Sequence, residues 1–288
     1  VAAIYVSHRL QEVFEIADRI TVLRDGRSVG TERTPALTRD RVIALMVGRQ
    51  VKELYPRAPA SSGDVVLQIA GWSVADPDNP GRHVVKGVGF QVRAGEVLGI
   101  GGLMGAGRTA LLSSLFGAGR SSVSGELRLA GRSSTAPFAS PAEAIARGVA
   151  LVSEDRKRYG LLLEAGVGEN LTLVALRHFA RRGFLDGAAQ EREAPAQCLS
   201  LRIKTPGLAT WAGQLSGGNQ QKIVLGKWLL AKPRVLLLDE PTRGIDVGAK
   251  AEIYALVNQL AASGLAVILV SSELPELLGL SDVHAIAH

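Results

Sequence analysis

Glycines, a basic residue and a hydroxyl stand in the spacing of a phosphate-binding loop at residues 102–109. In the letters GLMGAGRT, Gly102 and Gly107 fill the glycine positions and Thr109 fills the hydroxyl position. An apolar run precedes the loop and a helix-forming run follows it, so backbone N–H groups and the positive helix end converge there. Arg108 stands where such loops have lysine, and its planar guanidinium grips phosphate differently from a compact ammonium. We predict phosphate binding with altered transition-state geometry.

Two carboxylates, Asp239 and Glu240, follow the apolar run 235–238. At the carboxyl end of a parallel strand, Asp239 is placed to hold Mg²⁺ and Glu240 to polarise an attacking water. Acids at strand ends are common, but acids that follow a glycine loop are a rarer combination. A second glycine-rich helix start, LSGGNQQK at 215–222, forms another anion-binding N-terminus, or alternatively an N-cap with flexible glycines.

Apolar strands and helices alternate around these residues. Strands are predicted at 95–102, 148–154, 234–240 and 265–271, and helices at 109–117, 217–231 and 248–264. This alternation predicts a parallel sheet with helices on both faces. Residues 161–212 lack strand signals, so we expect an inserted helical subdomain at about these positions.

The opening of the chain recurs near its end. Residues 1–18 align with 265–282, and the matches include Ser7 with Ser271 and Glu12 with Glu276. Such a repeat is typical of two homologous domains in tandem. We expect a remnant of a first domain at 1–50, a linker at 51–64 and a second, C-terminally truncated domain at 65–288. Within the remnant we expect a buried strand at 1–8, a hairpin that turns at Asp25 and Gly26, and a helix at 39–47.

Composition excludes several classes of protein. The chain has 288 residues, of which 47% are hydrophobic, and its apolar runs fall far short of the ~20 residues of a membrane-spanning helix. A single cysteine, Cys198, excludes an intrachain disulfide. The net charge of +6 comes from scattered arginines without interleaved aromatic residues, so we expect no nucleic-acid partner.

The motifs resemble those of the ATP-binding cassette (ABC) ATPases, in the same order along the chain. The wording GLMGAGRT, VSEDRKRYGL, LSGGNQQK and DEPTRGIDVGAK is similar to the second cassette of the tandem ATPases that power bacterial sugar importers of the ribose, galactose and xylose type. The resemblance implies an α/β P-loop NTPase fold with a mostly parallel core sheet, an antiparallel β-subdomain and an inserted helical subdomain. It also implies ATP hydrolysis with Mg²⁺, and it names 215–222 the signature and 244–246 the D-loop.

ABC cassettes stack head to tail, so each nucleotide lies between the glycine loop of one cassette and the signature of the other. For this chain's own loop the resemblance implies that nucleotide is bound by Gly102, Gly105, Gly107, Arg108, Thr109 and Ala110. It implies that Mg²⁺ is held by Thr109, Asp239 and Glu154. It implies that a nucleotide on a first cassette is faced by Ser216, Gly217, Gly218 and Gln220.

Catalysis is implied at Glu240 in this site, while His8 matches the switch histidine of the first cassette's site. The self-alignment places Ser272 opposite His8, so the switch imidazole is missing here. Glu154 stands at the glutamine of the Q-loop, and Trp72, the nearest aromatic residue for adenine, is expected in the core. We therefore predict that this site binds ATP and Mg²⁺ but hydrolyses slowly, and that the isolated chain is weakly active or inactive.

The implied partners are the first cassette of the same full-length chain, integral membrane permease subunits and, indirectly, an extracytoplasmic sugar-binding protein. The implied location is the cytoplasmic face of the bacterial membrane. Alternatives are an importer of nucleosides or of a signalling sugar, a soluble cassette protein on ribosomes or in DNA repair, and a non-hydrolysing regulatory cassette. The basic residues 156–158 either face the membrane partner or form a solvated loop, and His284 and His288 receive no role.

Overall fold

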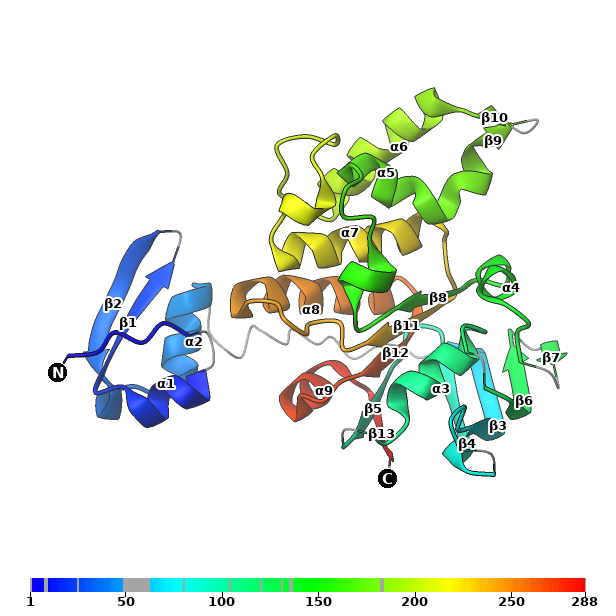
Figure 1. Ribbon diagram of the computed structural model, residues 1–288, viewed down its shortest axis with the longest axis horizontal. Coiled ribbons are helices and arrows are strands. Elements are labelled where there is room, and N and C mark those ends of the chain that lie inside the picture. The colour runs from blue at the N-terminus through cyan, green and yellow to red at the C-terminus, as the bar shows by residue number, and fades with distance from the viewer. Residues whose placement is uncertain are drawn as a thin grey trace.

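The computed structural model describes residues 2–7, 10–24, 26–48, 63–79, 81–103, 105–119, 121–130, 132–134, 137–181 and 184–287. A parallel sheet, an antiparallel sheet and a group of helices make up the larger part of the molecule, and a small amino-terminal unit lies to one side (Figure 1). The α/β fold with these parts was predicted and is confirmed.

The central sheet has five strands in the order β13-β5-β12-β11-β8, all of them parallel. Its strands are β5 (Val97–Gly102), β8 (Val149–Val152), β11 (Val235–Asp239), β12 (Ala266–Val270) and β13 (Val283–Ala287). All residues of β11 and β12 are buried, which is why these strands are continuous apolar runs without alternation. Strand β13 was not among the predicted strands, and it is a strand through its parallel pairing with β5.

Helices pack on this sheet and connect its strands. They are α3 (Arg108–Leu115), α4 (Pro141–Ala146), α8 (Val247–Ala262) and α9 (Leu274–Leu280). Helix α3 follows β5 directly and α8 follows β11, so the residues between a strand and its helix collect at the carboxyl edge of the sheet. This edge carries the predicted glycine loop and the predicted acids.

The antiparallel sheet has the order β4-β3-β6-β7. Its strands are β3 (Val65–Ala75), β4 (His83–Arg93), β6 (Val123–Leu129) and β7 (Arg132–Ser134). Trp72 on β3 is completely buried, and its Nε1 donates to Ser114 Oγ on α3 at 2.9 Å. The expectation of a core role for Trp72 is therefore confirmed.

Helices predominate between residues 161 and 230. They are α5 (Val167–Thr172), η4 (Leu173–Phe179), α6 (Gly187–Ser200), η5 (Ala212–Gln214) and α7 (Gly217–Leu230). One feature contradicts the expectation that this region lacks strands, since β9 (Ala180–Arg181) pairs with β10 (Phe184–Leu185) in a short antiparallel hairpin. Two-residue strands are too short to produce an alternating pattern in the sequence.

The amino-terminal unit (residues 10–48) has a small core of its own. It contains α1 (Leu10–Ile16), β1 (Arg19–Arg24), β2 (Arg27–Arg33), η1 (Thr34–Ala36) and α2 (Arg39–Val47), and α2 lies beside α8. The predicted hairpin and the helix at 39–47 are confirmed. Thr38 caps α2 by accepting from the backbone N–H of Arg41 at 3.2 Å, and Gly48 ends it in the left-handed region at φ 79°.

The predicted buried strand at the start of the chain is wrong. Residues 2–7 have no secondary structure, and Ile4 and Val6 are 96% and 89% exposed. A strand exists only through hydrogen bonds to a neighbour, and no strand of the described chain pairs with this segment. The predicted linker at 51–64 lies outside the described residues except for Gly63 and Asp64.

Candidate nucleotide-binding site

The glycine loop connects the end of β5 to the start of α3. Gly105 and Gly107 have φ values of 87° and 79°, a region that only glycine enters easily. Gly107 is also confined by space, because a Cβ atom there would lie 2.2 Å from the carbonyl oxygen of Val84 on β4. The loop is therefore held tightly against the antiparallel sheet, and the free N–H groups of the first turn of α3 are available to an anion.

Arg108, the first residue of α3, pairs with Glu240 just beyond β11. Its Nη1 lies 3.3 Å from Glu240 Oε1, and both side chains are only 10% exposed. Nη1 makes no hydrogen bond. The loop arginine is thus held in an ion pair by the carboxylate to which catalysis was assigned from the sequence.

Asp239 and Thr109 form the second contact between the loop and β11. Burial raises the pKa of Asp239, and a hydrogen bond with the Thr109 side chain acts in the opposite direction. Asp239 Oδ1 is buried without a hydrogen-bond partner. Carboxylate and hydroxyl oxygens are the ligands that Mg²⁺ prefers, so an unpartnered carboxylate oxygen near the Arg108 guanidinium fits a metal ion bound together with a phosphate.

Glu240 has a strained backbone and a second partner. Its φ is 47°, unusual for a residue with a Cβ, while its N–H donates to the carbonyl oxygen of Val270 at 2.9 Å. Ser272 Oγ donates to Glu240 Oε2 at 3.0 Å. The structure thus brings together Arg108, Thr109, Asp239, Glu240 and Ser272, with a hydroxyl where the repeat has His8. His8 itself lies outside the described residues.

Glu154 lies two residues beyond β8 and forms an ion pair with Arg243. This carboxylate is therefore engaged with a cation on the segment after Glu240. The part that sequence reasoning gave it, a ligand of Mg²⁺, stays a prediction. The pairing with Arg243 had no signal in the sequence, because the two residues are far apart along the chain.

The signature residues lie at the start of α7, which is apart from α3 in Figure 1. Ser216 is the N-cap of α7, and its Oγ accepts from Asn219 Nδ2 at 2.9 Å. A Cβ atom at Gly217 would lie 2.8 Å from Arg156 Nη2, and one at Gly218 would lie 2.4 Å from Ala249 Cβ. Packing against α8 thus requires glycine at 218, whereas at 217 a side chain would have to displace the end of Arg156.

Gln220 faces the interior. It is 4% exposed, its Nε2 donates to the carbonyl oxygens of Ala212 and Leu215, and its Oε1 accepts from Arg156. In this conformation its amide holds the loop before α7 together. Contact between Gln220 and a nucleotide stays a prediction that this placement does not favour.

Glu276 on α9 is a buried group that sequence reasoning did not use. It is 1% exposed, and burial raises the pKa of its carboxyl group from 4.5 to about 7. Ser271 donates to its Oε2 at 2.5 Å and Thr242 donates to its Oε1 at 3.1 Å. The repeat held a signal for it, because Ser7 and Glu12 match Ser271 and Glu276.

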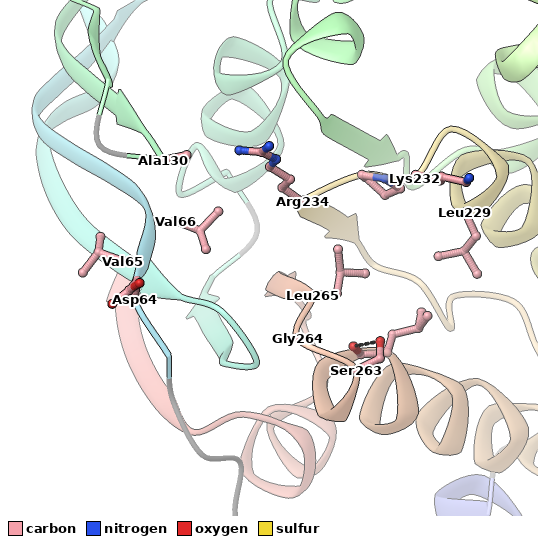
Figure 2. Close-up of a pocket in the computed structure, with 12 residues that line it drawn as sticks. Asp64, Val65, Val66, Ala130, Leu229, Lys232, Arg234, Ser263, Gly264 and Leu265 are labelled. Carbon is pink, nitrogen blue, oxygen red and sulfur yellow. Dashed lines mark hydrogen bonds between the residues drawn. The ribbon is translucent and has the colours of Figure 1, made fainter. Parts of the chain in front are cut away.

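A cavity of about 630 Å³ opens at the opposite edge of the parallel sheet (Figure 2). Its lining residues include Lys232, Arg234 and Ser263 before the amino ends of β11 and β12, and Asp64 before the start of β3. Ligands of open parallel sheets bind at the carboxyl ends of the strands. The cavity is therefore separate from the site at Arg108 and Asp239.

Comparison with known proteins places this site in a family. A family model described as ABC transporter matches residues 85–243, more than half of the 288 residues, and this stretch includes the glycine loop and both acids. The chain belongs to the ABC transporter family. Members of this family bind nucleotide, which is consistent with the free helix N-terminus at the glycine loop and with the unpartnered Asp239 Oδ1.

Curated ABC proteins are similar to nearly the whole chain. A xylose import ATP-binding protein of Geobacillus kaustophilus is 50% identical over 282 residues, which are 98% of this chain and 55% of that protein. One from Burkholderia cenocepacia is 51% identical over 284 residues, 98% and 54% of the two chains. A ribose/galactose/methyl galactoside import ATP-binding protein of Hahella chejuensis is 44% identical over 289 residues, 100% and 54%. The chain spans about half the length of these relatives.

Solved ABC cassettes share the fold. A nucleotide-free cassette superposes with a TM-score of 0.66 at 21% identity, covering 78% of this chain and 88% of its own. A cassette in its ADP conformation has a TM-score of 0.63 at 20% identity, covering 78% and 87%. None of these comparisons bears out the expectation that the isolated chain is weak or inactive. Among the described helices, none has the length and apolar character needed to cross a membrane.

Proposed function

We propose that this ABC cassette is the second of two in a longer ATPase that energises the import of a monosaccharide of the xylose, ribose or galactose type. The observation that carries the proposal is the group of Arg108, Thr109, Asp239 and Glu240, in which Asp239 Oδ1 is buried without a hydrogen-bond partner and Arg108 pairs with Glu240. The names of the relatives at 44% to 51% identity support the importer class.

In this proposal each residue of the site has one task. The phosphates of ATP are bound by the side chain of Arg108 and by the backbone of the glycine loop and its ends, including Gly102, Gly105 and Ala110. Thr109 and Asp239 hold Mg²⁺, which when bound neutralises charge on the phosphates. Glu240 accepts a proton from the attacking water, and Ser272 holds that carboxylate in place.

The two sites of the proposed tandem are unequal. Ser216 and Gly217 face the nucleotide that is held by the first cassette. His8 belongs to the same site and aligns the attacking water in it. The site at Arg108 lacks such an imidazole, and a hydroxyl is no proton acceptor near neutral pH. Hydrolysis is therefore faster in the first cassette's site than in this one.

The partners follow from the same proposal. The first cassette belongs to the same full-length chain, the permease subunits span the membrane, and a sugar-binding protein delivers the substrate from outside. The cassette pair lies on the cytoplasmic face. Specificity for the sugar is supplied by the membrane and binding-protein subunits.

The test uses the full-length protein with its permease in proteoliposomes that also hold the sugar-binding protein. ATP turnover and uptake of labelled xylose, ribose and galactose are measured for Glu240→Gln and for the matching change in the first cassette. We expect the first-cassette change to abolish turnover and Glu240→Gln to leave a clear fraction of it. Equal loss in the two variants contradicts the asymmetry, and no stimulation by any of the sugars contradicts the importer.

A regulatory cassette that binds ATP without hydrolysing it is the second candidate. The ion pair between Arg108 and Glu240 and the hydroxyl of Ser272 favour it, because both leave the site without a free general base. The same assay separates the candidates. Turnover unaffected by Glu240→Gln supports the regulatory cassette, whereas partial loss supports slow hydrolysis.

A further inference from the structure

The turn after β8 (η3, Arg156–Gly160) directs one of three consecutive cations into the molecule. Lys157 and Arg158 are exposed, and Arg158 lies over the ring of Tyr159 at 5.1 Å. Arg156 turns inward, and burial lowers the pKa of its guanidinium below the usual value. The two readings of residues 156–158, a face for the membrane partner or a solvated loop, therefore do not apply to Arg156.

All three guanidinium nitrogens of Arg156 donate hydrogen bonds. Nε donates to Gln220 Oε1 at 3.3 Å, Nη1 to the carbonyl oxygen of Arg243 at 2.9 Å, and Nη2 to that of Gly244 at 3.3 Å. The first acceptor belongs to α7, and the other two are the residue before the D-loop and the first residue of the D-loop. One side chain thus connects three segments that are distant in the sequence.

The bond to α7 reaches the signature through Gln220. The amide nitrogen of Gln220 donates to the carbonyl oxygens of Ala212 at 3.2 Å and Leu215 at 3.1 Å. Leu215 immediately precedes Ser216. The position of the guanidinium therefore fixes the orientation of the Gln220 amide and, through it, the backbone at the start of the signature.

The bonds to the D-loop are reinforced from the same turn. Glu154, two residues before Arg156, forms an ion pair with the side chain of Arg243. Gly244 has a φ of 67°, and glycine has little intrinsic preference for one backbone conformation. The direction of its carbonyl group therefore depends on contacts with other residues. Gly217 completes the junction, since a Cβ atom there would lie 3.2 Å from the Gly244 carbonyl oxygen and 2.8 Å from Arg156 Nη2.

We propose that Arg156 is a positioning residue that sets the spacing between the signature and the D-loop, so that both surfaces meet the partner cassette in one arrangement. This inference rests on the proposed function, because that function makes the two segments face a partner cassette. Arginine suits this place because its planar fork serves three acceptors at once and remains charged at every working pH. Lysine at the same position is able to reach one carbonyl group at a time.

The test compares Arg156→Gln and Arg156→Lys with Arg147→Gln in the full-length protein. Arg147 is a matched control, since it is an exposed arginine in an ion pair with Glu143 at 3.0 Å on α4. Hydrogen–deuterium exchange is read at the hydrogen-bonded amides of Gln220, Arg243 and Ile245. The amides of Ala106 and Leu111 report on the glycine loop as an internal reference.

In Arg156→Gln we expect faster exchange at Gln220, Arg243 and Ile245, by about tenfold for the loss of a charged hydrogen bond at each segment. Exchange in the glycine loop and the affinity for ATP stay within about twofold, while kcat falls and KM does not. Arg156→Lys gives intermediate exchange and kcat, and Arg147→Gln matches the parent protein in every readout.

Two results overturn the proposal. One is unchanged exchange in either segment, and the other is an equal rise in exchange across the glycine loop, which indicates general loss of stability. Absence of ATP turnover in the parent protein contradicts the proposed function only, because the exchange measurement still decides whether Arg156 links the two segments.

Discussion

The ion pair between Arg108 and Glu240 makes a specific prediction about ATP affinity. A phosphate that binds at Arg108 must compete with this carboxylate, which lies 3.3 Å from the guanidinium with both side chains 10% exposed. At an effective dielectric constant of about 20 the attraction at this distance is about 5 kcal/mol, before the desolvation of both charges is subtracted. Glu240→Gln keeps the shape of the side chain and removes this competition.

We expect Glu240→Gln to strengthen ATP binding by about 1 to 2 kcal/mol, or roughly five- to thirtyfold in Kd. This gain in binding free energy is smaller than the full attraction, because water also hydrates the freed guanidinium before ATP binds. Removing a negative charge beside the phosphates acts in the same direction. The nucleotide-free variant is expected to melt at a lower temperature than the parent protein, because Arg108 is left without its ionic partner.

Calorimetric titration with ATP and Mg²⁺ measures the affinity, and thermal unfolding without nucleotide measures the stability. Glu273→Gln is the matched control, because it removes the same charge from an exposed carboxylate that pairs with Lys250. A Kd for Glu240→Gln equal to that of the control, or weaker than that of the parent protein, refutes the reasoning. Tighter binding together with lower nucleotide-free stability is the pattern that a broken ion pair predicts.

Three further changes test the fold around the site. Gly107→Ala is expected to abolish ATP binding and to destabilise the chain more than Gly105→Ala, because a Cβ atom at 105 would meet nothing within 4 Å. Unfolding curves and ATP titrations of the two variants measure the difference. Glu276→Gln should leave the free energy of unfolding unchanged below pH 4.5 and raise it by about 3 kcal/mol at pH 8. The pKa of Glu276 is raised to about 7 in the folded chain, so the parent protein loses stability when this carboxyl group ionises at higher pH. Denaturant titrations at both pH values measure the difference. Trp72→Phe should lower the free energy of unfolding by about 2 kcal/mol through the lost bond to Ser114, and unaltered ATP affinity is required if Trp72 is core.

Local patterns were sufficient for most of the elements. The strand before the glycine loop, the helix at 39–47 and the buried run 235–238 are each recognisable from neighbouring residues alone, because period and capping are properties of a short segment. Expectations failed where an element depends on a distant neighbour. Residues 2–7 have the composition of a buried strand, but no strand in the described part of the chain pairs with them, and β13 is a strand because β5 pairs with it.

The same distinction holds for the site. Residue type and spacing alone identified the glycine loop, Asp239 and Glu240, since a phosphate loop and a strand-end acid are local motifs. The pairing of Arg108 with Glu240 and of Glu154 with Arg243 had no such signal, because these contacts join segments brought together only by the parallel sheet.

The sequence by itself determined the family, with the nucleotide binding common to its members, and most of the elements, because each follows from short motifs whose meaning does not depend on distant residues. The tertiary structure alone decided that Asp239 Oδ1 lacks a hydrogen-bond partner, that Arg156 turns inward, and that Glu240 is the carboxylate that pairs with Arg108. Those contacts depend on the packing of β8, β11 and α7 against one another, and a linear pattern contains no measure of that packing.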